Sequence, residues 1–142
     1  MLSEIEICRL RSWVMARQSG PLGYHVLLDY SNYFPPMSDD GAWVLDTLRL
    51  CARSAGAREV HSHVESFDGS VSPTGFAALV LIDESHVTAH CYSEKGLLAV
   101  DVFTCGGSNP DHIADKLDSL LLENVPGIKL NRREKVARFK GD

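Results

Sequence analysis

The residues most able to do chemistry lie in the middle of the chain, around a serine. Ser85 stands between Glu84 and His86, and His90 follows four residues after His86. On an extended strand this spacing places both histidines on one face. Cys105 ends a later apolar run. A serine, two histidines and a cysteine near strand ends can supply a nucleophile, a general base and a proton donor.

These residue types alone leave other interpretations open. A plain β-meander with polar strand ends would have the same composition. A metal site built from His61, His63, His86 and His90 is another alternative, although no cysteine lies beside them at a zinc-ligand spacing. A serine hydrolase centred on Ser85 is weaker still, because the Gly-x-Ser-x-Gly sequence of a nucleophile elbow is missing. No metal is therefore predicted.

The hydrophobic pattern around this segment predicts strands and two longer helices. Ser38, as N-cap, opens a helix that runs to about Ala55, and Asn109 opens a second helix. The run from Phe76 to Ile82 is apolar throughout, which predicts a strand covered on both faces. A short helix over 2–18 is also predicted, together with strands over 22–30, 59–67, 76–82, 87–92, 97–104 and 128–139. This pattern indicates an α+β fold, a two-layer sandwich in which helices cover an antiparallel sheet.

Length and composition restrict the partners and the compartment. A chain of 142 residues suits one domain, predicted over residues 1–142, and its net charge of −5 gives no reason to expect nucleic acid. The basic residues after Ile128 are predicted to form a solvated terminal strand. Residues 1–18 carry five charges and no long apolar run, so neither a signal peptide nor a membrane span is predicted. The four cysteines form no Cys-x-x-Cys pair, which favours reduced thiols in the cytoplasm.

The segment from Glu84 to Gly106 resembles the S-adenosylmethionine decarboxylase family in its small prokaryotic form. That form carries a Glu-Ser-His tripeptide, a second histidine four residues after the first, and a Val-Asp-x-Phe-Thr-Cys-Gly run, found here at residues 100–106. The sequence Leu-Gly-Tyr-His at residues 22–25, followed by Asp29, resembles the family's first strand. The resemblance covers roughly residues 21–121 and implies that family's sandwich fold.

By this resemblance the protein is a self-cleaving, pyruvoyl-dependent decarboxylase. Ser85 would attack the carbonyl carbon of Glu84, giving a β chain of residues 1–84 and an α chain of residues 85–142. Ser85 would become a covalent pyruvoyl cofactor, which forms a Schiff base with the substrate amine and accepts the electrons left as CO₂ departs. The resemblance makes His90 the base of the cleavage step and Cys105 the proton donor to the substrate. It also implies a homodimer of processed protomers.

Several positions depart from the family pattern where substrate binding or cleavage is expected. The aromatic residue that stacks on adenine is replaced by Val71, with Phe67 four residues upstream. A serine or threonine that assists cleavage is replaced by Ala77, and Asp83 stands where a small or neutral residue is usual. A lost stack removes about 1–3 kcal/mol of binding to a nucleoside. The added carboxylate could instead pair with a substrate ammonium or guanidinium.

These departures predict a basic amino acid, L-ornithine or L-arginine, as the small-molecule substrate. S-adenosylmethionine, whose decarboxylation supplies aminopropyl groups for spermidine, is the alternative, and an uncleaved regulatory relative is the alternative of another class. Residues 90–94 keep the family's acidic residue, Glu94, which is implied to bind a ribose hydroxyl, and they introduce Tyr92. The candidate substrate-binding residues are Glu94, Asp83, Val71, Phe67 and Tyr92.

Overall fold

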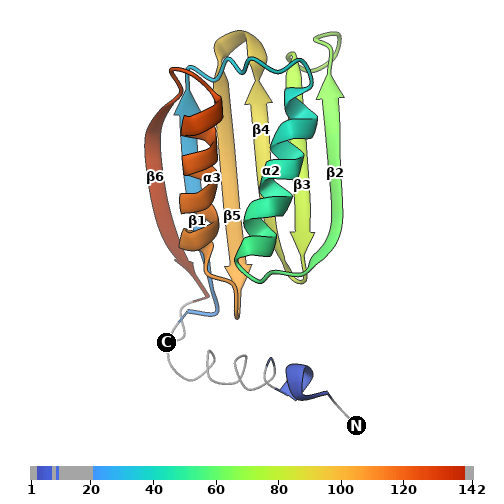
Figure 1. The fold of residues 1–142 in the computed structure, drawn as a ribbon, viewed down its shortest axis with the longest axis vertical. Helices are drawn as coiled ribbons and strands as arrows, with labels where there is room; N and C mark the ends of the chain where they lie inside the picture. The colour runs from blue at the N-terminus through green and yellow to red at the C-terminus, as the bar shows by residue number, and fades with distance from the viewer. Residues whose placement is uncertain (1–2, 8, 10–20, 140–142) are drawn as a thin grey trace.

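The computed structural model describes residues 3–7, 9 and 21–139. Within them, an antiparallel sheet with strand order β2-β3-β4-β5-β1-β6 carries helices α2 and α3 on one face (Figure 1). The elements are β1 (Gly23–Ser31), α2 (Asp40–Ser54), β2 (Glu59–Phe67), β3 (Gly75–Ile82), β4 (Ser85–Tyr92), a 3-10 turn (Ser93–Lys95), β5 (Leu97–Cys105), α3 (Pro110–Asn124) and β6 (Lys129–Arg138). The predicted two-layer α+β sandwich is confirmed.

The two helices begin where polar side chains cap free backbone N–H groups. The Asp39 carboxylate accepts a hydrogen bond from the Ala42 N–H at 3.3 Å, so Asp39 caps α2, and the prediction of Ser38 as cap is wrong by one residue. A carboxylate at that position also interacts favourably with the helix dipole. Asn109 caps α3 as predicted, accepting from the Asp111 N–H at 3.0 Å. Most of the helix predicted over 2–18 lies outside the described residues, and residues 4–7 and 9 are helical.

The two faces of the sheet differ in what covers them. Alternate residues of the central strands, such as Val87 and Val102, are fully buried under the helices. The other face has no covering layer among the described residues. Leu81 and Leu97 on it are 36% and 40% exposed, so the prediction that the strand 76–82 is covered on both faces is wrong for the single chain. Both helices pack on the same face, which leaves the second apolar face open.

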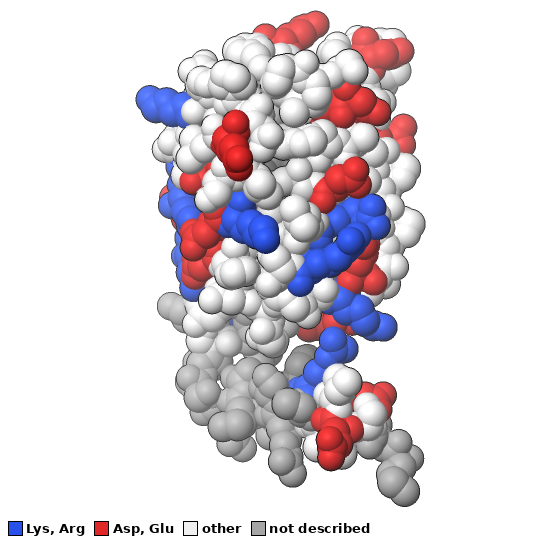
Figure 2. All heavy atoms as spheres, in the orientation of Figure 1, with Lys and Arg blue, Asp and Glu red and all other residues white. Residues whose placement is uncertain are grey.

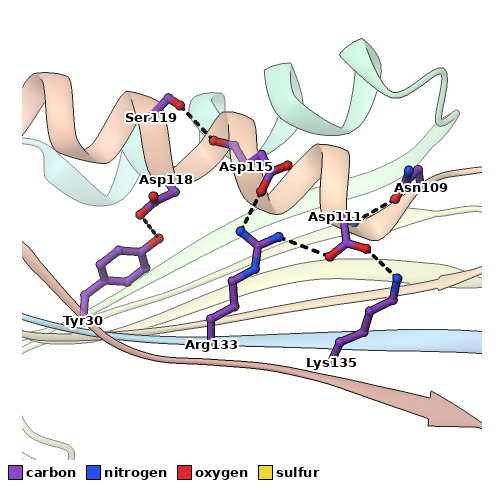
Figure 3. Close-up of polar contacts among 8 residues, drawn as sticks. All are labelled: Tyr30, Asn109, Asp111, Asp115, Asp118, Ser119, Arg133 and Lys135. Carbon is purple, nitrogen blue, oxygen red and sulfur yellow. Dashed lines mark hydrogen bonds and ion pairs between the residues drawn. The ribbon is translucent and has the colours of Figure 1, made fainter.

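The edge strand β6 is joined to α3 by ion pairs (Figure 3). Arg133 donates to Asp115 at 2.6 Å and to Asp111 at 3.2 Å, and Lys135 donates to Asp111. These pairs lie on the helix side of β6, where an inner strand would carry apolar residues. The predicted solvated terminal strand is confirmed, with Arg133 and Lys135 paired to α3.

The surface gives no sign of one dominant charge on the helix-covered side. Acidic and basic side chains are interspersed over the face drawn in Figure 2. Among the described residues, no helix combines the length and the apolar character needed to cross a membrane.

Candidate active site

Ser85 and Cys105 meet at one end of the sheet, the lower end in Figure 1. Ser85 begins β4 and Cys105 ends the neighbouring strand β5. The Ser85 side chain is 4% exposed, and its Oγ accepts a hydrogen bond from the Cys105 backbone N–H at 2.8 Å. This contact fixes the hydroxyl oxygen while its own proton remains free to be removed. The serine predicted as nucleophile and the cysteine predicted as proton donor are therefore neighbours.

The Cys105 thiol occupies space that exists because the facing residue is glycine. Gly23 of β1 lies directly opposite Cys105 in the β1–β5 pair. A Cβ atom on Gly23 would lie 2.9 Å from Cys105 Sγ and 2.7 Å from the Thr104 carbonyl oxygen. Burial raises the pKa of the Cys105 thiol, and the nearby Glu84 carboxylate raises it further. The thiol therefore keeps its proton at neutral pH, as a proton donor must.

The Gly23→Ala protein is expected to lose most of its turnover, because the new methyl group would displace the thiol. We expect kcat per cleaved chain to fall about tenfold and the free energy of unfolding to fall by about 1–3 kcal/mol, the usual cost of overpacking. Gly107→Ala is the matched control, since a Cβ there would meet no atom within 4 Å. Turnover assays and thermal unfolding of both proteins test this, and unchanged turnover in Gly23→Ala would contradict it.

A cavity of about 360 Å³ opens beside the Ser85–Cys105 contact. Its lining includes Arg9, Ala57, Glu84, Ser85, Cys105 and Gly106. The bond between Glu84 and Ser85 therefore borders a space able to admit a small molecule or water.

His90, predicted as the base of the cleavage step, lies far from Ser85 within the chain. His90 is on the same strand, and five residues at about 3.3 Å each place it about 16 Å from Ser85. It lies on the open face, exposed, between Ala77 and Ala99 of the neighbouring strands. The serine or threonine of the family pattern would thus place its hydroxyl beside His90, whereas Ala77 places only a methyl group there.

The candidate substrate-binding residues cluster at the opposite end of the sheet, except for one. Phe67 ends β2, Tyr92 ends β4, and Glu94 lies in the 3-10 turn after it. Val71 is in the loop between β2 and β3 and is 96% exposed. The structure does not bring these four to Ser85 within one chain.

Asp83 is the exception, but its carboxylate is already paired. Arg58 donates to Asp83 Oδ1 through Nε at 2.9 Å and through Nη2 at 2.6 Å. Arg9 Nη2 lies 3.6 Å from the other oxygen. The prediction that Asp83 serves a basic substrate is therefore not supported, because two guanidinium groups of this chain take that place.

A polar array near the site was missed by sequence reasoning. His25 Nε2 lies 3.0 Å from Asp101 Oδ1, and Arg138 Nη1 lies 3.5 Å from His25 Nδ1. The Asp101 carboxylate and the Arg138 guanidinium thus lie at the two different ring nitrogens of His25. His86 packs edge-on against His25, and burial together with His25 lowers the pKa of His86. His25 and Asp101 belong to the segments 22–25 and 100–106 that resemble the family, whereas no pattern in the sequence indicates that Arg138 joins them.

The four-histidine metal hypothesis finds no support. Within residues 3–7, 9 and 21–139, no three histidine, cysteine or acidic side chains are grouped to hold a metal ion. His61 lies on β2 and His86 on β4, with β3 between them. His63 pairs instead with Glu65 at 2.9 Å.

Comparison with known proteins identifies the family. The profile described as S-adenosylmethionine decarboxylase matches residues 24–133. The S-adenosylmethionine decarboxylase proenzyme of Parasynechococcus marenigrum is 38% identical over 85 residues, 60% of this chain and 63% of that protein. That of Prochlorococcus marinus is 33% identical over 104 residues, 73% of this chain and 80% of that protein.

A solved structure agrees with the fold. The adenosylmethionine decarboxylase from Aquifex aeolicus superposes with a TM-score of 0.61 at 23% identity, covering 87% of this chain and 96% of that one. The resemblance carried by residues 84–106 is thus confirmed. The chain belongs to the S-adenosylmethionine decarboxylase family, whose members are pyruvoyl-dependent carboxy-lyases made as proenzymes.

Proposed function

We propose that the protein is the proenzyme of a pyruvoyl-dependent decarboxylase that acts on S-adenosylmethionine. The observation that carries the proposal is the contact of Ser85 Oγ with the Cys105 backbone, beside a cavity at the Glu84–Ser85 bond. This contact supports Ser85 as nucleophile and Cys105 as proton donor in one site. The names of the relatives support the substrate.

This substrate replaces the basic amino acids expected from the sequence. Two departures suggested ornithine or arginine, namely Val71 and Asp83. The pairing of Asp83 with Arg58 removes the free carboxylate that a basic side chain would need. Val71 is 96% exposed in a loop at the opposite end of the sheet, and the aromatic rings of Phe67 and Tyr92 lie at that same end. S-adenosylmethionine, the alternative, is the better choice.

The residues at the cleavage bond fit the formation of a pyruvoyl group. Ser85 Oγ attacks the Glu84 carbonyl carbon, and the peptide bond between Glu84 and Ser85 breaks. An ester then joins the Glu84 carbonyl to Ser85 Oγ, and the α-amino group of Ser85 is free. A base removes the Cα proton of residue 85, and elimination expels the Glu84 carboxylate. Water then replaces the nitrogen, which leaves as ammonia. The products are a β chain of residues 1–84 and an α chain of residues 85–142.

Each residue then has a separate task in decarboxylation. The pyruvoyl group supplies a carbonyl that withdraws the electron pair left as CO₂ departs. Cys105 holds a proton at the site and delivers it to the substrate carbon. The position of Cys105, opposite Gly23, places its thiol on the open face of the sheet.

The proposal includes a homodimer in which two open sheet faces pack together. The face carries exposed apolar residues, Leu81 and Leu97 among them, whose burial would stabilise such a contact. A two-fold axis between the sheets and perpendicular to the strands would place the Glu94 end of one protomer over the Ser85 end of the other. His90 of the partner subunit could then act as the base at Ser85. The dimer also explains why the site residues separate within one chain.

The protein acts in the cytoplasm, where Cys51, Cys91 and Cys105, free in the structure, remain reduced. There its product supplies aminopropyl groups for polyamine synthesis.

CO₂ release from carboxyl-labelled substrates tests the reaction. Purified protein is incubated separately with S-adenosylmethionine, L-ornithine and L-arginine, and the intact mass of the chains is recorded. We expect two chains of residues 1–84 and 85–142 and release from S-adenosylmethionine alone. Release of CO₂ from ornithine or arginine instead would contradict S-adenosylmethionine as the substrate. A single inactive chain would favour the regulatory relative, which Ala77 beside His90 suggests.

A further inference from the structure

The bond to be cleaved lies at the exit of a tight turn between β3 and β4, at the lower end in Figure 1. Ile82 pairs with Ser85 across the two strands, so only Asp83 and Glu84 form the turn. Asp83 has φ of +54°. Turns of this length favour glycine, asparagine or aspartate at positive φ, and of these only glycine adopts that conformation without a cost in free energy. The backbone directly before the Glu84–Ser85 bond is therefore held in an unfavourable conformation.

The conformation of Asp83 is held by an arginine from the segment that leads into β2. Arg58 stands immediately before β2 and binds Asp83 Oδ1 through two nitrogens, at 2.9 Å and 2.6 Å. Arg9 approaches the second carboxylate oxygen at 3.6 Å. The Asp83 side chain is 26% exposed, whereas that of Arg58 is 67% exposed. The turn is thus held by β3 and β4, which it connects, and also by the Arg58 side chain from the segment before β2.

The two partners of the cleavage reaction are held by different parts of the fold. The nucleophile, Ser85 Oγ, is fixed by the Cys105 N–H of β5. The carbonyl that it attacks belongs to Glu84, whose position depends on the turn. Glu84 is exposed, so packing alone does not fix it.

We propose that the Arg58–Asp83 ion pair is a clamp that holds the turn for self-cleavage. It keeps Asp83 in its left-handed conformation and so keeps the Glu84 carbonyl within reach of Ser85 Oγ. Arg58 and Asp83 are positioning residues, since neither touches the bond that breaks. The inference rests on the proposed function and explains an aspartate at a position where the family pattern has a small or neutral residue.

A clamp and a merely stabilising ion pair predict different results. An ion pair this exposed contributes little to the free energy of unfolding, so its loss should leave the thermal midpoint nearly unchanged. The rate of cleavage should nevertheless fall, because the turn relaxes and the carbonyl moves away from the hydroxyl. Turnover per cleaved chain should stay the same in Arg58→Gln, since Arg58 has no part in decarboxylation.

The test follows cleavage after cell-free synthesis, in which every chain starts intact. We expect Arg58→Gln and Asp83→Asn to be cleaved about three- to tenfold more slowly than the unchanged protein. Arg58→Lys keeps the charge with one contact and should be intermediate. Asp83→Gly adopts positive φ without strain but lacks the carboxylate, so it should also be slow. Arg53→Gln is the matched control, because Arg53 is similarly exposed and pairs with Glu59 instead.

Four outcomes separate the possibilities. Cleavage of Arg58→Gln and Asp83→Asn at the unchanged rate would overturn the clamp. So would a loss of rate that simply follows a loss in thermal midpoint, or an equal loss in Arg53→Gln. Absence of cleavage in the unchanged protein would instead count against the proposed function itself.

Discussion

The Ser85→Ala protein is expected to remain a single chain of 142 residues and to release no CO₂ from S-adenosylmethionine. Without Oγ there is no atom to attack the Glu84 carbonyl, and without cleavage no pyruvoyl group forms. Decarboxylation should fall by at least about a thousandfold, to the level of the uncatalysed reaction. Intact-mass measurement checks the cleavage, and CO₂ release checks the activity.

Folding must be separated from chemistry in this variant. Ser85 Oγ accepts the Cys105 N–H, so its loss leaves a donor without its partner and costs about 1–3 kcal/mol of stability. Thermal unfolding will register that cost as a lowered but cooperative transition. Ser108→Ala is the control, because Ser108 lines the same cavity without standing at the cleaved bond. If Ser85→Ala were still cut at this position, Ser85 could not be the nucleophile.

Much of the fold follows from local sequence signals. The apolar runs predict the strands, and Asn109 with the proline after it predicts the start of α3. Ser85 and Cys105 come together because they stand at the facing ends of consecutive strands in one hairpin, which the order of elements already suggests. The cap of α2 was misplaced because Ser38, Asp39 and Asp40 are all competent caps, and only the backbone conformation selects Asp39.

The rest depends on contacts between segments far apart in the chain. The extended conformation of β4 separates His90 from Ser85, so the role predicted for His90 depends on a contact with another chain, which the sequence does not reveal. Arg58 meets Asp83 across 25 residues, and Arg138 meets His25 across 113. Such pairs depend on strand register and order, which the spacing of residues does not specify. An apolar strand such as β3 likewise does not reveal whether its second cover belongs to the same chain.

A mixture of two inactive variants is expected to recover cleavage. Neither His90→Ala nor Ser85→Ala should be cleaved alone, because the first lacks the base and the second lacks the nucleophile. In a mixed dimer, the intact Ser85 of the His90→Ala chain would face His90 of the partner subunit. The His90→Ala chain should then be cleaved, while the Ser85→Ala chain remains whole.

The expected yield follows from random pairing. Equal amounts of the two chains place half of the His90→Ala chains in mixed dimers, so about half of them should be cleaved. Different affinity tags and intact mass distinguish the chains after co-expression. A Ser85→Ala/His90→Ala double variant is the matched partner control, since it can form the same dimer but offers no histidine.

The result decides between two arrangements of the site. If His90 acted within its own chain, the strand would have to bend back over about 16 Å, and mixing would rescue nothing. If the open faces pack together, the separation of Ser85 from His90 along β4 is needed, because the His90 end of one sheet then lies over the Ser85 end of the other. Recovery with the Ser85→Ala partner, and none with the double variant, would establish that each active site draws on two chains. Normal cleavage of His90→Ala alone would remove His90 from the mechanism and leave the base to be sought among the residues beside Ser85, with His86 and His25 first in line.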